Sequence, residues 1–306
     1  MVLVAKRTTG KRPAGKGKRP TTEKRSTGKN PASKRPATGN RPVASKRPTP
    51  RRSPEHSYDL IEGRRAVYEA LDAGVPLAKA LIARQNAEQD ASFVALCKRL
   101  QQEGVACEEV SRQVLDSLSS HGAHQGIVVR TQPFVYAQLD DILDRATADH
   151  ELVLILDHVT DEGNFGAIIR SAEVVGSAGV VIAKARAARV GTAVYKTSAG
   201  AVFHTPIAQV SNLASAIDTL KEKGFWVAGA TEHAQQLAWD APLHGRLALV
   251  VGSEGKGISQ LLLKKCDFSC KLPQRGIVES LNVAQATTAL CFEWLRQSTG
   301  LSSDLL

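Results

Sequence analysis

The second half of the chain alternates short apolar runs with longer segments whose apolar residues recur every three or four positions. The short runs are typical of buried strands and the longer segments of amphipathic helices. Strands are predicted at 152–156, 180–183, 225–230, 247–251 and 268–272, and helices at 166–175, 192–198, 211–223, 258–264 and 281–297. Such alternation predicts an α/β fold with a parallel sheet that helices cover on both faces.

A smaller α/β unit is predicted before this region. Helical spacing covers 64–73 and 92–102, and each segment is followed by a glycine that can end a helix, Gly74 or Gly104. Strands are predicted at 77–82, 105–110 and 127–129. The turn before the last strand carries His121 and His124, which we interpret as turn or surface-contact residues, because no third metal ligand accompanies them.

Residues 1–54 follow neither pattern. Apolar residues are nearly absent after Val4, and Lys-Arg-Pro recurs at 11, 18, 34 and 46. This segment holds 17 of the 40 Lys and Arg residues but only one of the 30 Asp and Glu residues. The rest of the chain therefore holds 23 basic and 29 acidic residues. The net charge of +10 therefore belongs to a basic tail, which cannot bury enough apolar surface to fold. It suits a phosphate backbone, and a solubilising tail is the alternative.

These patterns predict four parts. They are a disordered tail at 1–56, a small α/β domain at 57–131, a linker at 132–148 with one short helix at 139–146, and a larger α/β domain at 149–300. No apolar run is long enough for a transmembrane helix or a secretory signal, so a cytoplasmic protein is expected. The five cysteines are interpreted as free thiols rather than metal ligands, although Cys266 and Cys270 lie close together.

Three polar, glycine-containing blocks lie at or beside the ends of predicted strands. They run from Asp157 to Ala172, from Leu249 to Gly257 and from Leu272 to Val283. Ligands of open parallel sheets bind beyond the carboxyl ends of the strands. The three blocks are therefore expected to build one pocket.

Each block also has a purely structural explanation. Asn164 and Ser280 stand where helices are predicted to begin, so both can be helix N-caps. Arg170 lies in a largely apolar helix and needs either an ion pair or a polar cleft. The glycines of 252–257 allow a ligand to approach the backbone, or form an ordinary turn. The last helix is apolar on more than one face, which predicts a subunit interface.

Taken together, the blocks resemble the three signature motifs of the SpoU or TrmH family of RNA ribose 2′-O-methyltransferases. The matching residues, in chain order, are Asn164 and Arg170, then Gly252-x-Glu254-Gly-x-Gly257, then Ser280-Leu281-Asn282-Val283. The resemblance covers about residues 57–297. Within the family, 124–126, 198–201 and Pro206 are most similar to bacterial enzymes that methylate a guanosine of 23S rRNA.

This resemblance implies a trefoil-knotted catalytic domain, S-adenosylmethionine as methyl donor, a small first domain that binds RNA, and a homodimer whose site uses both subunits. The implied catalytic and substrate residues are Arg170, Asn164, Glu254, Ser280 and Asn282. The implied cofactor-binding residues are Gly252, Leu272, Leu281 and, more weakly, the loop near Thr231. Arg170 is expected to orient the nucleotide rather than to act as a base, because a guanidinium stays protonated.

Two departures and three alternatives accompany the resemblance. Glu162-Gly163 stands where the family commonly has a proline before Asn164, and Gln274-Arg275 stands where small or apolar residues are usual. A tRNA ribose can be the target instead of rRNA, or the chain can be a catalytically silent RNA-binding or ribosome-assembly factor on the same fold. A nucleotide-dependent enzyme that uses 252–257 as a phosphate loop is disfavoured, because this loop lacks the Gly-Lys-Ser/Thr ending and carries Glu254.

Overall fold

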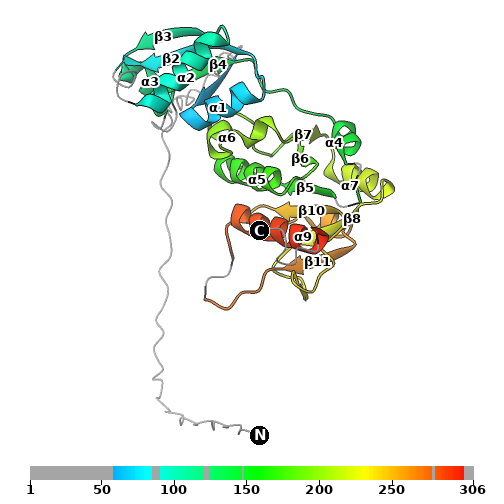
Figure 1. Cartoon of the computed structure of the whole chain (residues 1–306). Coiled ribbons are helices and arrows are strands. Elements are labelled where there is room, and N and C mark those ends of the chain that lie inside the picture. Colours follow the sequence, from blue (N-terminus) through cyan, green and yellow to red (C-terminus); the bar gives the residue numbers. More distant parts are fainter. Residues whose placement is uncertain are drawn as a thin grey trace, which may run out of the picture. The chain divides into compact units, whose positions relative to one another are not determined.

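The structure, a computed structural model, describes residues 58–84, 90–119, 124–146, 148–149, 151–277 and 280–299. Within these residues the chain forms two sheets, one of four strands between residues 59 and 131 and one of seven strands between residues 151 and 271 (Figure 1). The proposed tail and His121 lie outside the described residues. No helix of the described residues is long and apolar enough to cross a membrane.

The four-stranded sheet has the order β1-β4-β2-β3. Its strands are β1 (Asp59–Glu62), β2 (Leu77–Ala83), β3 (Ala106–Val110) and β4 (Ile127–Thr131), and its helices are α1 (Arg64–Asp72), α2 (Ala91–Gln102) and α3 (Arg112–Leu118). Ile61, Ala80 and Ile82 pack with α1 and α2, whereas Leu81 and Val128 pack with α3. The sequence pattern predicts these elements except β1 and α3.

Glycines and a histidine occupy the turns of this unit. Gly74 and Gly104 follow α1 and α2 with φ of 65° and 76°, a region that disfavours side chains. His124 is buried, its Nε2 lies 2.9 Å from Asp116 Oδ1, and its Nδ1 accepts the Gly126 N–H at 3.0 Å. His124 is therefore a turn residue whose two ring nitrogens are both occupied.

The seven-stranded sheet has the order β7-β6-β5-β10-β8-β11-β9, and every neighbouring pair is parallel. The strands are β5 (Glu151–Asp157), β6 (Gly179–Ala183), β7 (Ile207–Val210), β8 (Trp226–Ala230), β9 (Gln236–Leu237), β10 (Arg246–Gly252) and β11 (Phe268–Lys271). The prediction of a parallel α/β sheet is confirmed. The short strands β7 and β9 were not predicted.

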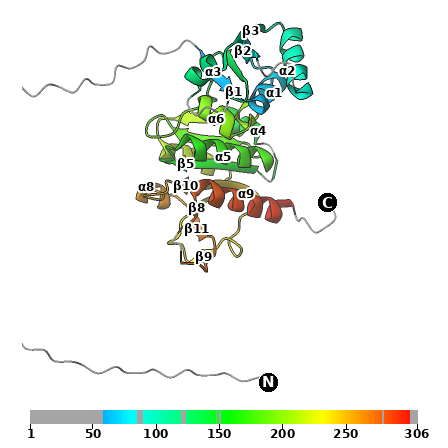
Figure 2. The same ribbon diagram turned by 90° about the vertical axis from the view of Figure 1, so that its left-hand side faces the viewer.

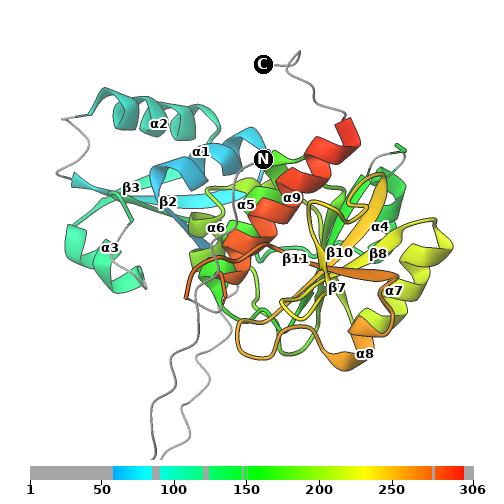
Figure 3. The same ribbon diagram turned by 90° about the horizontal axis from the view of Figure 1, so that it is seen from below.

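Helices cover both faces of this sheet because the side chains of its central strands alternate. Leu152 and Leu154 of β5 belong to the core that contains α5 (Glu162–Val174), α6 (Thr192–Thr197) and α9 (Val283–Thr299). Val153 and Ile155 belong to the core that contains α4 (Leu139–Arg145), α7 (Leu213–Glu222) and α8 (Gln260–Leu263). Figures 2 and 3 show α5 and α9 side by side on one face.

The parallel direction brings the ends of the functional strands to one edge. Asp157, the last residue of β5, is paired in register with Gly252, the last residue of β10. The ends of β8 and β11, Ala230 and Lys271, lie at the same edge because both strands run parallel to β10 or to each other. The three polar blocks therefore lie at the same edge of the sheet.

Two helix caps differ from the sequence interpretation. Helix α5 begins at Glu162, and its N-cap is Asp161, whose Oδ1 accepts the Asn164 N–H at 2.7 Å. Asn164 is therefore in the first helical turn, and its side chain is not used for capping. Helix α9 begins at Val283, and Asn282, not Ser280, caps it by accepting from Ala284 N at 2.9 Å.

Candidate active site

The loop after β10 is closed by a backbone hydrogen bond and packs tightly against the end of that strand. Gly257 N–H donates to the Ser253 carbonyl at 2.8 Å, and Gly257 has a φ of 61°. A Cβ on Gly252 would lie 2.0 Å from the Gly257 carbonyl carbon and 2.2 Å from the Ile258 nitrogen. Gly252 is therefore required because backbone, rather than a movable side chain, fills the space beside it.

One residue from each of the three blocks meets the others in a hydrogen-bonded cluster. Glu254 Oε1 accepts from Asn164 Nδ2 at 2.9 Å and from Asn282 Nδ2 at 2.8 Å. Asn282 Nδ2 also donates to Asn164 Oδ1 at 2.8 Å. Because Asn282 caps α9 through its other atom, Oδ1, one side chain joins the start of α9 to α5 and to the loop after β10.

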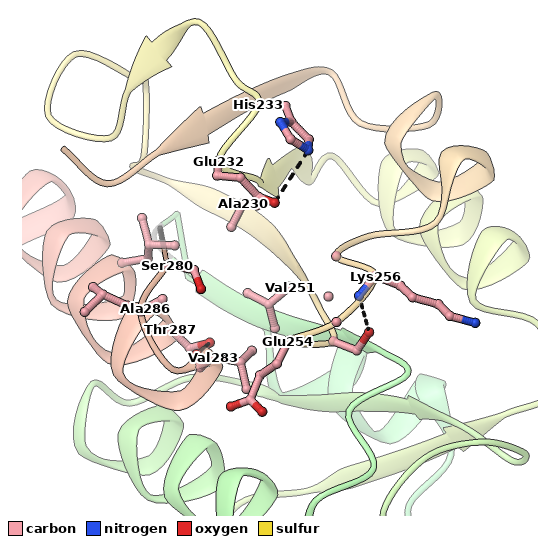
Figure 4. Close-up of a pocket in the computed structure, with 16 residues that line it drawn as sticks. Ala230, Glu232, His233, Val251, Glu254, Lys256, Ser280, Val283, Ala286 and Thr287 are labelled. Atoms are coloured by element: carbon pink, nitrogen blue, oxygen red, sulfur yellow. Dashed lines mark hydrogen bonds and ion pairs between the residues drawn. The ribbon is translucent and has the colours of Figure 1, made fainter. Parts of the chain in front are cut away.

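A cavity of about 560 Å³ opens beside this loop at the carboxyl ends of β8 and β10 (Figure 4). Its volume lies within the range of small-molecule sites. Val251, Leu281 and Leu290 supply apolar wall, Glu232 supplies a carboxylate, and Ser280 supplies a hydroxyl. Residues 252–257 also line the cavity.

The cavity includes some of the predicted cofactor residues and omits others. Gly252 and Leu281 line it, whereas Leu272 and Thr231 do not. Leu272 packs on the hydrophobic core, and Thr231 N–H donates to the Cys270 carbonyl at 3.0 Å. The neighbours of Thr231, namely Ala230, Glu232 and His233, line the cavity instead. Sequence analysis missed Glu232 and His233, although their position just after a predicted strand was a usable signal.

Arg170 does not join the cluster within one chain, contrary to the expectation of a single pocket. It is exposed on α5 and lines a separate depression with Glu173, Val174 and Ser198. Among the described residues, its guanidinium makes no hydrogen bond or ion pair. The reason is helical geometry, because six positions after Asn164 correspond to about 600° of rotation, which directs Arg170 away from Asn164.

Comparison with known proteins agrees with this site. Residues 151–292 match the SpoU rRNA Methylase family, and residues 60–137 match the family described as RNA 2′-O ribose methyltransferase substrate binding. The chain is 39% identical over 243 residues to the putative TrmH family tRNA/rRNA methyltransferase YacO of Bacillus subtilis, which covers 78% of this chain and 96% of that protein. This chain belongs to the SpoU/TrmH family of RNA methyltransferases. A Staphylococcus aureus relative with the description putative TrmH family tRNA/rRNA methyltransferase is 37% identical, over 78% of this chain and 96% of its own.

Solved structures of SpoU proteins share the fold. The SpoU methyltransferase AviRb from Streptomyces viridochromogenes, in complex with the cofactor AdoMet, has 27% sequence identity and a TM-score of 0.65, over 79% of this chain and 90% of its own. A structure described as an RNA 2′-O ribose methyltransferase has 27% identity and a TM-score of 0.66, over 79% of this chain and 89% of its own.

SpoU methyltransferases use S-adenosylmethionine, and the cavity beside 252–257 fits that molecule. The apolar side chains of Val251, Leu281 and Leu290 suit an adenine ring, and the exposed peptide groups of the glycine loop can bond its polar edge. The Glu232 carboxylate suits a cationic ligand. The five cysteines form no disulfide in the structure.

Proposed function

We propose that this SpoU/TrmH protein transfers a methyl group to the 2′-hydroxyl of a ribose in RNA, and that its target is a guanosine of 23S rRNA. The observation that carries the proposal is the cluster of Asn164, Glu254 and Asn282, whose Glu254 lines the cofactor-sized cavity. Its three side chains come from the three signature motifs and keep one another in a single arrangement.

In this proposal the cofactor binds against Gly252, Leu281 and the loop around them, and Leu272 and Thr231, which do not line the cavity, have no direct contact with it. Bound S-adenosylmethionine supplies an activated methyl group. The protein then has to align the ribose hydroxyl, and such alignment contributes up to about 7–11 kcal/mol in favourable cases. Ser280 lines the cavity with a hydroxyl, and Asn164 and Asn282 hold Glu254 Oε1, so that its Oε2 remains available to a substrate group.

We assign Arg170 to the substrate side of the same reaction, contributed by a second copy of the chain. Two observations support a homodimer. Arg170 lies outside the cluster formed by its own chain, and apolar side chains are exposed on the paired helices α5 and α9, with Val174 58% and Phe292 47% exposed. We also propose that the catalytic domain is trefoil-knotted, as the family resemblance implies.

The proposed reaction is tested by mapping 2′-O-methylation in total RNA from strains with and without the gene. Loss of one methylated guanosine in 23S rRNA, restored by the wild-type gene but not by the Asn282→Asp variant, is the expected result. Loss of a tRNA methyl group instead would identify tRNA as the substrate and contradict the rRNA assignment. Unchanged maps, together with no heat of S-adenosylmethionine binding in calorimetry, would indicate a catalytically silent RNA-binding protein.

The basic tail is proposed to contact the RNA backbone without reading sequence. Deleting residues 1–54 removes 17 basic residues and one acidic residue, so RNA affinity and its salt dependence should both fall. Filter binding to rRNA at several salt concentrations measures both quantities. An unchanged slope of log K against log salt would assign the tail a solubilising role only.

A further inference from the structure

A second cavity, of about 610 Å³, lies across the loop 253–257 from the cofactor cavity. We call it the His158 cavity. The two cavities share Glu254, Lys256 and Val283 as lining residues. The His158 cavity additionally contains Asn164 and is lined by the segments that follow β5 and β6. The loop with the clustered Glu254 is thus a common wall of both cavities.

Two cationic side chains of the His158 cavity have no partner within the described residues. Arg186 and Lys256 line it, and among the described residues neither side chain makes a hydrogen bond or an ion pair. Two carboxylates line the same cavity and keep their negative charge, although one oxygen of each is bonded to neutral N–H groups: Asp161 Oδ1 accepts from Asn164 N, and Glu254 Oε1 accepts from two amides. Figure 4 shows the Lys256 side chain directed away from the labelled residues of the cofactor cavity.

His158 is fixed in this cavity by a buried carboxylate. Its Nδ1 lies 2.6 Å from Oδ1 of Asp157, and Oδ2 of Asp157 accepts the Ser259 N–H at 2.7 Å. Because the ionised carboxylate only accepts, the proton of this hydrogen bond is on Nδ1. Nε2 of the half-exposed imidazole is then left for a ligand.

The backbone of the cavity is also unusual. The described residues include four non-glycine residues with positive φ, and two of them, His158 at 60° and Arg186 at 58°, line this one cavity. Side chains disfavour this conformation, which persists where the surrounding structure enforces it and concentrates at ligand sites. The fold thus holds two polar side chains at the cavity in conformations that cost free energy.

We propose that the His158 cavity binds a phosphate group of the RNA strand beside the methylated nucleotide, through Arg186, Lys256 and His158 Nε2. Guanidinium and ammonium groups form charge-assisted hydrogen bonds with phosphate oxygens. A phosphate held here brings the adjoining ribose to the shared wall, where Asn164 and Glu254 lie. This inference rests on the proposed function and specifies how the substrate strand enters its site.

The test compares the double variant Arg186→Ala/Lys256→Ala with a control of equal charge, Lys223→Ala/Lys264→Ala. Both control lysines are exposed at the ends of α7 and α8. Each full-length protein methylates rRNA from the deletion strain with labelled S-adenosylmethionine, and calorimetry gives its cofactor affinity. We expect kcat/KM for RNA to fall at least 10-fold in the cavity variant, mainly through KM, with cofactor Kd within twofold of wild type. The control should stay within twofold in both. Arg186→Lys should recover part of the loss.

Each other outcome has a defined meaning. An equal loss in the control would show a general charge effect, and an equal loss of cofactor affinity would assign the cavity to the cofactor; either result overturns the phosphate inference. Wild-type kinetics in the cavity variant would overturn it while leaving the proposed function intact. A wild-type protein that neither binds S-adenosylmethionine nor methylates RNA would contradict the proposed function itself. The unchanged tail contributes equally to all the proteins compared.

Discussion

Gly252 is the last residue of strand β10. The backbone of residues 257 and 258 passes so close to it that no side chain fits there. The neighbouring Gly255 meets nothing within 4 Å of its Cβ position, and its φ is outside the positive region. Two glycines of the same loop therefore have different reasons for being there. Gly252 lets the backbone of residues 257 and 258 pack against the end of β10. Gly255 has room for a side chain.

Gly252→Ala should consequently open the loop and weaken cofactor binding. Overpacking of this kind costs about 1–3 kcal/mol, which corresponds to roughly a 5- to 150-fold loss of S-adenosylmethionine affinity if the strain falls on the cavity wall. Calorimetry measures the cofactor affinity, and thermal unfolding measures the stability. Gly255→Ala is the matched control and should leave both near wild type. Equal effects of the two substitutions would refute the assignment of Gly252 as the close-contact glycine.

The residue scale also shows what sequence can predict about the site. Asn164, Glu254 and Asn282 could be assigned to one pocket because each follows or precedes a strand end, and parallel strands bring these ends to one edge. Their capping roles could not be assigned. Asp161 and Asn164 are both good N-cap residues, and only the position at which the backbone turns helical decides between them.

At the scale of elements, the long helices and most strands were predictable, and the short strands β1, β7 and β9 were not. Strand β9 has only two residues, and β1 begins and ends with acidic residues, so neither carries an alternating pattern. Both are held by pairing with a neighbouring strand, which is a tertiary effect. Helix α9 shows how one element acquires two tasks, since Asn282 both caps it and binds Glu254.

Two substitutions of Asn282 should separate these tasks. In Asn282→Asp the capping oxygen is kept and a negative charge suits a helix N-terminus, but the donor to Glu254 is replaced by a like charge. We expect near wild-type stability and at least about a 100-fold loss of methyl transfer. Asn282→Ala should lose the same activity and also about 0.5–2 kcal/mol of stability. Urea unfolding and methylation assays measure these effects, with Gln285→Ala as control. Full activity of Asn282→Asp would show that the amide donor is dispensable.

The buried thiols of β11 and α9 should be unreactive in the folded protein. Burial raises the pKa of Cys270 to about 11 and that of Cys291 to about 12, because it disfavours the thiolate. At pH 8 the thiolate fraction is then roughly 200-fold below that of a free cysteine for Cys270 and roughly 2,000-fold below it for Cys291. Alkylation by iodoacetamide, followed by mass spectrometry, should label both sites slowly until the protein is unfolded with guanidinium. Rapid labelling under native conditions would contradict this burial.

At the scale of the whole molecule, one chain contains the cofactor-sized cavity but keeps Arg170 apart from it. The six-residue spacing places Asn164 and Arg170 on different sides of one helix, but the sequence does not show which side of that helix borders the cavity. Exposed Val174 and Phe292 on the same helical layer offer a surface for a second copy. The proposed active site is therefore a property of a dimer and not of the isolated chain.

Mixed dimers test whether Arg170 acts across subunits. Arg170→Ala and Asn282→Asp homodimers should each lose methyl transfer by at least about 100-fold, while Arg170→Ala keeps cofactor affinity within twofold. If each site takes Asn282 from one chain and Arg170 from the other, a heterodimer of these variants contains one site with both groups intact, and one without either. Purified by two different affinity tags, it should therefore show about half of the wild-type kcat. If Arg170 acts on the cavity of its own chain, both sites of the heterodimer are defective and no activity returns. A heterodimer of Asn164→Ala with Asn282→Asp is the control and should remain inactive, because both of these residues belong to the cluster of a single chain.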